Sequence, residues 1–525
     1  MVEKTARIGF AVLASRVQAL APATAARTSA SARARRVADE CRKYIQKREW
    51  PGDSSVQVIC PDDPVMNLDD ASRAASLFRQ SQVDALVIQY ATHSPGNLTA
   101  ELVRDLPVPL ALWAVPEIQF ESNPLNCGSM MSMLEHAASL TALCRRFTFV
   151  HGLPDADEAR RDVDRFIRAV VVRHALRHAA IARVGSRPAG SYPCIVDELA
   201  IKGILGTEVH HVGVAEVLAQ VGKLQQDEID ADLSSVRSGD YLIEASDAEA
   251  VQRSCAVHVA LRRIVSQYGL AALAINCLPG SASSPPRPLS KLGEGESASS
   301  PPHSLSKLGE GEWGVRKLGI CAAASRLTDA GTPTACSGDI DGALTMLIQH
   351  LYTGRPPFYG NWLQRDEKNN VVTFWNCGNA PASLVSPRFE PKITDSPSGS
   401  DNVILDFPLK TGDVTLARLQ WSASPPPSLS TLASSHHPLS NLGWGAWGVR
   451  KYRMLLVRGR AVETPPALKG TFVNIRFEPP VRSLLETFLR YGFPPHVSIV
   501  YEDIEDDLRE FALQAGIEVV EATKE

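Results

Sequence analysis

A short acidic segment is the first place in this sequence where the residue types suggest chemistry. Residues 332–354, TPTACSGDIDGALTMLIQHLYTG, read as a buried strand, a Ser-Gly-Asp turn and an amphipathic helix. Asp339 stands at the turn, where a carboxylate can hold a divalent metal or move a proton. The same position also predicts a helix N-cap that accepts hydrogen bonds from free backbone N–H groups. Spacing alone favours the cap over the other two roles.

Further polar residues follow other predicted strands. They lie in YATHSPGN (90–97), LWAVPE (112–117) and WNCGN (375–379), and His496 begins the predicted strand in FPPHVSIV. Open α/β sheets bind their ligands beyond the carboxyl ends of the strands. These residues are therefore the candidates for a binding site together with Asp339, although a histidine in this position is by default an ordinary, partly buried one.

Several familiar chemistries have no signature in the chain. The sequence contains no G-x-x-x-x-G-K-[ST] loop, no strand-linked G-x-G-x-x-G and no G-x-S-x-G elbow, so neither a nucleotide cofactor nor a serine hydrolase is indicated. A formal net charge of -4 gives no reason to expect nucleic acid as a partner. The ten cysteines form no C-x-x-C pair, which predicts reduced thiols in a cytoplasmic protein. No apolar run is long enough to predict a membrane span.

The elements that must position these residues alternate regularly. From residue 6 to about residue 385, short apolar runs alternate with segments of helical periodicity, which is typical of parallel, doubly wound sheets. Beyond that point several predicted strands follow one another without helices, which favours antiparallel pairing. The predicted fold is therefore α/β, with two doubly wound parallel-sheet domains followed by an antiparallel, β-rich, barrel-like C-terminal domain. The predicted boundaries are 1–180, 181–385 and 386–525.

Two segments interrupt this rhythm. Residues 281–296 and 297–312 repeat nearly the same Pro-, Ser- and Gly-rich sequence, and a degenerate relative of it begins at residue 422. The pentapeptide WGVRK stands at the end of each of the two interruptions, at residues 313–317 and 447–451. Because such compositions bury little surface, we interpret 281–316 and 422–451 as repeat insertions that the fold does not need.

Taken together, the strand-end segments resemble the L-arabinose and L-fucose isomerase superfamily. QYATHSPGN, followed by LALWAVPE, is similar to the strand-end loop that reads H-T-F-S-P in arabinose isomerases. NPLNCGSMMSMLEH resembles the helix start after that loop, and GSYPCIVDELAIKGILGTEVHHVGVAEVL resembles the segment that opens the second domain. LTDAGTPTACSGDIDG and VVTFWNCGNAP resemble the metal-site region. The order and spacing of these segments extend the resemblance over nearly the whole chain outside the insertions.

The resemblance implies an activity and a set of site residues. Members of the family interconvert aldoses and ketoses with a divalent metal, usually Mn²⁺, which holds two sugar oxygens while a carboxylate moves a proton between C1 and C2 through an enediol. By resemblance, Asp339 is the catalytic residue, and Asp339 and His496 are metal ligands. The implied substrate-binding residues are Asn361, Asn376, Trp113 and Glu117, the last two at the pocket of the same or a neighbouring subunit.

Three positions depart from the family pattern. Ser337 stands where the family often has glutamate, Asn361 where relatives have an acidic residue, and Asn376 where they have histidine. Neutral serine and asparagine bind a divalent ion far less tightly than glutamate and histidine do. The departures therefore predict a weakened Mn²⁺ site around Asp339 and His496.

Two functions stay open at this point. The first is a cytoplasmic ketol-isomerase that acts on a small-molecule sugar and assembles as a homo-oligomer, a trimer or a hexamer, with no nucleic-acid or membrane partner. The second is a metal-independent, catalytically impaired relative that binds sugar or regulates. A third, altered carbohydrate chemistry without metal, has no positive sign in the sequence.

Overall fold

The structure is a computed structural model that divides into two compact units. The N-terminal unit comprises Val2–Arg177 and Asp506–Gly516, and the C-terminal unit comprises His178–Glu505 and Ile517–Glu525. The described residues are 5–14, 36–46, 50, 55–116, 128–188, 190–239, 241–276, 320–396, 402–423 and 450–523.

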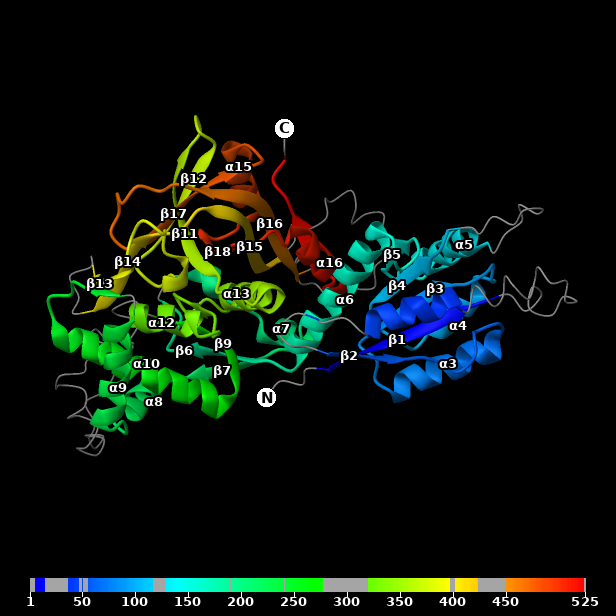
Figure 1. The fold of residues 1–525 in the computed structure, drawn as a ribbon, viewed down its shortest axis with the longest axis horizontal. Helices are drawn as coiled ribbons and strands as arrows, with labels where there is room; N and C mark the ends of the chain where they lie inside the picture. Colours follow the sequence, from blue (N-terminus) through cyan, green and yellow to red (C-terminus); the bar gives the residue numbers. More distant parts are fainter. Residues whose placement is uncertain are drawn as a thin grey trace, which may run out of the picture. The chain divides into compact units, whose positions relative to one another are not determined.

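A parallel sheet of five strands forms the centre of the N-terminal unit (Figure 1). Its order is β2-β1-β3-β4-β5, and every neighbouring pair is parallel. The strands are β1 Thr5–Leu13, β2 Ser55–Ile59, β3 Ala85–Tyr90, β4 Leu110–Ala114 and β5 Thr148–His151. The helices are α3 Leu68–Gln80, α4 Asn97–Val103, α5 Ser129–Ala142, α6 Asp157–Arg177 and α16 Glu505–Ala515. Every residue of β3 and β4 is buried, as expected when helices cover both faces of a parallel sheet.

The C-terminal unit contains a smaller parallel sheet of order β10-β9-β6-β7. Its strands are β6 Ala180–Val184, β7 Glu208–Val212, β9 Leu270–Ile275 and β10 Thr334–Ala335. The helices of this part are α7 Glu198–Ile204, α8 Val214–Val221, α9 Gln226–Ser238, α10 Ala248–Tyr268, α12 Ile320–Asp329 and α13 Ile340–Thr353. Apolar side chains of β6 and β9 pack with α8, α10 and α12 in one hydrophobic cluster.

A second sheet of the C-terminal unit has the order β19-β16-β15-β18-β11-β12-β17-β14-β13-β8 among the described residues. The strands are β8 Leu242–Ile243, β11 Phe358–Asp366, β12 Val371–Asn376, β13 Lys392–Asp395, β14 Val403–Pro408, β15 Gly412–Ala423, β16 Arg450–Val462, β17 Thr471–Phe477, β18 His496–Val500 and β19 Glu518–Val520; helix α15 is Val481–Tyr491. Because β16 also pairs with β17, the strands β15-β16-β17-β12-β11-β18 close into a ring. All pairings around this ring are antiparallel.

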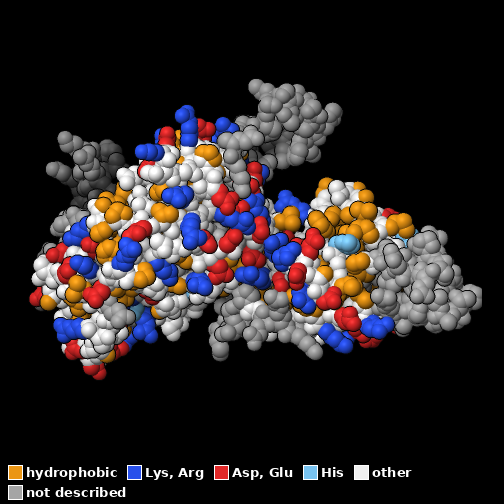
Figure 2. Space-filling view, turned by 45° about the horizontal axis from the view of Figure 1, so that its top comes forward, with side chains coloured by type: hydrophobic (Ala, Val, Ile, Leu, Met, Phe, Trp, Pro, Cys, Tyr) orange, Lys and Arg blue, Asp and Glu red, His pale blue; other side chains and the backbone are white. Residues whose placement is uncertain are grey.

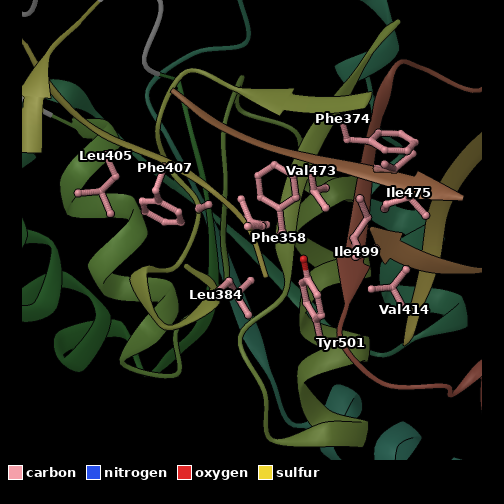
Figure 3. Packing of buried hydrophobic residues seen from close by; sticks show 14 of the residues in the cluster. Phe358, Phe374, Leu384, Leu405, Phe407, Val414, Val473, Ile475, Ile499 and Tyr501 are labelled. Carbon is pink, nitrogen blue, oxygen red and sulfur yellow. The ribbon is translucent and has the colours of Figure 1, made fainter. Parts of the chain in front are cut away.

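The ring encloses a hydrophobic core (Figure 3). Phe358 of β11, Val473 of β17 and Ile499 of β18 have no exposed surface and lie close together there. Trp362 and Phe374 meet edge-on with 5.9 Å between their ring centroids. Helix α13 packs against β9 on one side and against β15 and β18 on the other, so this helix connects the parallel sheet to the ring (Figure 1).

The predicted fold class is confirmed, since parallel sheets with helices are followed by a mostly antiparallel, closed arrangement of strands. The predicted domain 181–385 lies in the C-terminal unit, and so does 386–525 apart from Asp506–Gly516, which belongs to the N-terminal unit. The insertions 281–316 and 422–451 lie outside the described residues except at the ends of the second, where Ser422 pairs with Lys451. The second insertion therefore joins two strands that are hydrogen-bonded neighbours.

Charged side chains of both signs are interspersed on the face shown in Figure 2. Lysines and arginines alternate there with aspartates and glutamates, and no extended block of one sign is visible on that face. Within the part of the chain that the structure describes, no helix is both long enough and apolar enough to cross a membrane.

Candidate active site

The turn before α13 brings Asp339 to the carboxyl end of β10. Ser337 and Gly338 both have a φ of 60°, so the chain turns through the left-handed region directly after the strand. The N–H of Gly338 donates to the carbonyl of Ile275, which ties this turn to β9. Asp339 then begins α13, because the N–H of Gly342 donates to its Oδ1 at 2.9 Å. The predicted N-cap is confirmed.

The order of the parallel sheet explains why polar residues gather at this edge. The chain runs from β6 to β7 on one side and to β9 and β10 on the other, and open sheets bind ligands where the strand order reverses in this way. Arg183 of β6 donates from Nε to the carbonyl of Gly338 at 3.1 Å and from Nη2 to the carbonyl of Cys194 at 3.1 Å. Arg183 thus fixes the turn that carries Asp339.

Asp339 is also one half of a buried ion pair. Arg418 of β15 donates from Nη1 to Oδ2 at 2.6 Å and from Nη2 to Oδ1 at 3.2 Å. Tyr359 of β11 donates its hydroxyl to Oδ2 at 2.5 Å. The side chains of Asp339 and Arg418 have no exposed surface. Together with the cap, these contacts give each carboxylate oxygen two hydrogen bonds.

The charges of this pair are stable at neutral pH. Burial alone would raise the pKa of Asp339, but the charge and hydrogen bonds of Arg418 outweigh it and hold the pKa below its ordinary value. Burial would lower the pKa of Arg418, and the neighbouring Asp339 raises it instead. Burial and the charge of Asp339 both raise the pKa of Tyr359. Asp339 and Arg418 are therefore ionised, and Tyr359 keeps its proton.

His496, the first residue of β18, contacts this cluster through Tyr359. The two rings stack with 5.4 Å between their centroids and 6° between their planes. Nδ1 of His496 is buried without a hydrogen-bond partner among the described residues, while the residue as a whole is partly exposed. Burial lowers the pKa of His496 in spite of the nearby Asp339, so the ring is neutral at pH 7. Asn361 is its direct neighbour in the β11–β18 register.

Asn376 links the end of β12 to the same cluster. Its Nδ2 donates to the carbonyl of Tyr359 at 3.0 Å and to Sγ of Cys336 at 3.5 Å. Its Oδ1 accepts from the backbone N–H groups of Gly378 and Asn379 at 3.2 and 3.3 Å. Because Asn376 has no exposed surface, its amide serves to hold the strands and the turn together.

No family model matches the chain, but its sequence is similar to curated sugar isomerases. A sulfoquinovose isomerase of Alkalicoccus urumqiensis is 25% identical over 466 residues, which cover 88% of this chain and 89% of the relative. Those of Priestia aryabhattai and Clostridium sp. (strain MSTE9) are 24% and 21% identical, over 90% and 86% of this chain and 94% and 89% of their own. These similarities support a sugar isomerase of the fucose and arabinose isomerase superfamily.

Similarity to solved structures is low. An extracellular ligand-binding receptor from Rhodopseudomonas palustris HaA2 is 13% identical and covers 52% of this chain and 61% of its own, with a TM-score of 0.17. A score at this level supports no conclusion about fold or function.

Four residues predicted for this isomerase homologue meet in the C-terminal unit. They are Asp339, Asn361, Asn376 and His496, which come from the turn before α13 and from three strands of the ring. Their roles toward a sugar remain predictions. Of the four, Asn361 and His496 are partly exposed, whereas Asp339 and Asn376 are fully buried.

The other two predicted residues belong to the N-terminal unit. Trp113 of β4 has no exposed surface, and its Nε1 donates to the carbonyl of Gly152 at 2.9 Å. Its side chain is part of a hydrophobic cluster of that unit. Glu117 lies outside the described residues.

The residues around Asp339 do not fit a divalent-metal site. Among the described residues, no three or more His, Cys, Asp or Glu side chains are grouped so that they could hold a metal. Both oxygens of Asp339 are engaged, and the guanidinium of Arg418 already supplies positive charge at that point. Ser337 is neutral, and the amide of Asn376 is used within the protein. While Arg418 occupies the carboxylate of Asp339, the imidazole of His496 is the remaining donor among these residues, and it is too small a donor set for Mn²⁺.

Residues outside the predicted set complete the cluster, and Asp341 is the second buried acid. It accepts from the backbone N–H of Trp421 at 3.1 Å and from the hydroxyl of Tyr452 at 3.1 Å. Burial raises the pKa of Asp341 to about 7.

The sequence does contain a signal for Arg418. It is a charged residue inside the apolar strand TLARLQW, and a buried strand rarely carries an arginine without a partner.

Proposed function

We propose that this chain is an aldose–ketose isomerase whose substrate is sulfoquinovose or a closely similar sugar. The observation that supports this most is the extent of the similarity: relatives named sulfoquinovose isomerase align with 86% to 90% of this chain and with 89% to 94% of their own length. A similarity confined to one borrowed domain would leave most of either chain unmatched. Here the coverage is too large to be confined to one of the two units.

His496 is the residue that we assign to proton transfer. In the open-chain aldose a base takes the proton from C2 and returns it to C1, while a proton moves from O2 to O1, so that the ketose has the same atoms and charge. His496 suits this task because its ring is neutral, partly exposed and held in place by Tyr359. Asp339 has no exposed surface, so we assign to it the positioning of Tyr359 and Arg418.

Other residues of the cluster fit the binding of sugar hydroxyls. Asn361 and Ser337 are partly exposed, and an amide and a hydroxyl can both donate to and accept from a sugar. Asn376 is assigned to holding the strands around them. A contribution of Trp113 and Glu117, a cytoplasmic location and assembly into a trimer or hexamer belong to the same proposal and rest on the family resemblance.

Turnover by the purified full chain tests this function. Sulfoquinovose and glucose, which lacks the sulfonate, are incubated separately with the protein, and ketose formation is followed by NMR. We expect ketose from sulfoquinovose. His496→Gln should lower kcat by at least about 100-fold, the usual minimum for loss of a general base, with an unchanged unfolding midpoint. His211→Gln is the matched control, since His211 is exposed on β7, and it should keep full activity.

A different outcome would favour the second function. Saturable binding of sulfoquinovose without turnover of either sugar would contradict the isomerase and support a sugar-binding or regulatory relative. Ketose formation that is equal in the wild type and in His496→Gln would contradict the assigned role of His496.

A further inference from the structure

The polar centre of the C-terminal unit already contains a cation. The guanidinium of Arg418 meets the carboxylate of Asp339 through hydrogen bonds of 2.6 and 3.2 Å, and neither side chain is exposed. A planar guanidinium matches a carboxylate in this two-point geometry and stays charged at any physiological pH. A Mn²⁺ ion on the same oxygens would have to displace Arg418 or lie against its positive charge, where the low dielectric constant strengthens repulsion.

Among the described residues, no group of three or more His, Cys, Asp or Glu side chains near Asp339 could hold a metal. Ser337 is neutral, and both polar atoms of the Asn376 amide are engaged in hydrogen bonds. Asp341 is the nearest further acid along α13, but it is buried, and its two oxygens accept from Trp421 and Tyr452. Arg418 already balances the negative charge of Asp339, and the neutral side chains of Ser337 and Asn376 offer no further negative charge to balance a metal ion.

The ion pair is linked directly to the proposed base. Tyr359 donates to the same Oδ2 of Asp339 that Nη1 of Arg418 uses. The ring of Tyr359 in turn stacks on His496. Arg418 therefore holds the carboxylate of Asp339 in place, and this carboxylate holds the hydroxyl of Tyr359. The ring of Tyr359 in turn holds the orientation of the His496 imidazole.

We infer that Arg418 takes the place of the divalent metal that the family resemblance implies, and that this chain holds its active site together without a metal. Arg418 has no exposed surface, so it does not touch the sugar. It is a positioning residue that acts on His496 through Asp339 and Tyr359. This last step rests on the proposed function, whereas the replacement of the metal by Arg418 does not.

Metal content and thermal stability test the inference without any assay of turnover. The full chain, purified without chelator, is analysed for Mn, Fe, Co, Ni and Zn by mass spectrometry, and its unfolding midpoint is measured in buffer, in Mn²⁺ and in EDTA. We expect no stoichiometric metal and the same midpoint under all three conditions. A ligand that binds the native state stabilises it. Stoichiometric metal that EDTA removes with a fall in the midpoint would overturn the inference.

A variant of Arg418 tests whether the guanidinium occupies the place of the metal. Arg418→Met leaves the carboxylate of Asp339 without its cation, so we expect Mn²⁺ to raise the unfolding midpoint of this variant. Arg453→Met is the matched control, because Arg453 is also a buried arginine, paired with Glu518 at 2.8 Å. It should not respond to Mn²⁺. A folded Arg418→Met that ignores Mn²⁺ would contradict the inference, and if this variant does not fold, the wild-type measurement decides.

The positioning role has its own readout. Tyr359→Phe keeps the ring against His496 but removes the hydrogen bond to Asp339, so kcat should fall by about tenfold, the equivalent of one lost hydrogen bond. KM should stay unchanged, and the pH profile of kcat should shift, which a purely structural role would not produce. An unchanged kcat and profile would contradict the role. Absence of turnover in the wild type would count against the proposed function alone, since the metal measurements would still stand.

Discussion

Arg418 and Asp339 would each be costly to bury alone, because taking a charge out of water costs several kcal/mol. The pair is tolerated because each oxygen of Asp339 also accepts a second hydrogen bond, from Gly342 or Tyr359. The cap was predictable from the sequence because Gly342 lies within the same turn of helix. The pairing of Asp339 with Arg418 was not predictable, because Arg418 is 79 residues away along the chain and the fold decides which acid it meets.

Removal of Arg418 should show how far the stability of the protein depends on this ion pair. Arg418→Met is expected to destabilise the protein by about 3–5 kcal/mol, because Asp339 is then a buried charge without compensation. Asp339→Asn/Arg418→Met should recover much of the loss, since no charge remains. Unfolding midpoints of the wild type, the single variant and the double variant test this. A double variant that is less stable than the single one would contradict it.

Asp341 should make stability depend on pH. Its pKa of about 7 lies above the ordinary value of 3.8, so the folded protein holds this proton more tightly than the unfolded chain does. Between about pH 4 and pH 7 only the unfolded state loses the proton, and stability therefore falls as pH rises, by on the order of a few kcal/mol. Asp341→Asn should flatten this slope in denaturation midpoints measured across the range. An equal slope in both proteins would contradict the assignment.

At the scale of elements, α13 holds the site because it packs closely on the strand ring. A Cβ at Gly342 would lie 2.5 Å from Cε2 and 2.7 Å from the hydroxyl of Tyr359. The helix can therefore approach β11 only where it has no side chain. This approach brings the N-cap of α13 within reach of both β11 and β15.

Gly342→Ala should destabilise the protein although alanine favours helices. The added methyl group has to push Tyr359 away from Asp339, and overpacking of this kind costs about 1–3 kcal/mol. Gly203→Ala in α7 is the matched control, because a Cβ there meets nothing within 4 Å. It should be neutral or stabilise by up to about 1 kcal/mol. Unfolding midpoints compare the two, and an equal effect would contradict the close packing at Gly342.

The elements were largely predictable from periodicity. The amphipathic helix predicted within residues 332–354 is α13, which could be placed because helical periodicity is a local pattern. The closed ring was predictable only as a barrel-like tendency, because closure depends on the pairing of β16 with β17, which no local pattern encodes. Tyr359 was missed for the same reason, since its alternation in β11 gives its face but not the carboxylate that it meets.

At the scale of the whole molecule, the repeat insertions are the segments that we interpret as unnecessary for the fold. The relatives align with most of this chain at 21% to 25% identity, so most of the aligned residues differ. Ser422 and Lys451 show that the second insertion joins paired strands. A connection between neighbouring strands tolerates added length at small entropic cost.

Deletion of residues 281–312 should leave the fold intact. These residues connect β9 to α12, and their repeated Pro-, Ser- and Gly-rich sequence contributes little apolar surface to a core. We expect the same circular dichroism spectrum and unfolding midpoint as in the full chain. Insoluble protein, or a midpoint several degrees lower, would contradict the interpretation as an insertion.

The most direct test of the isomerase chemistry follows solvent hydrogen into the sugar. Sulfoquinovose is incubated with the full chain in D₂O, and the recovered aldose and ketose are examined by NMR and mass spectrometry. A base that exchanges its proton with solvent should place deuterium at C2 of the aldose and C1 of the ketose, with wild type but not with His496→Gln. Absence of both ketose and exchange, or ketose that carries no deuterium, would contradict proton transfer through an enediol at His496.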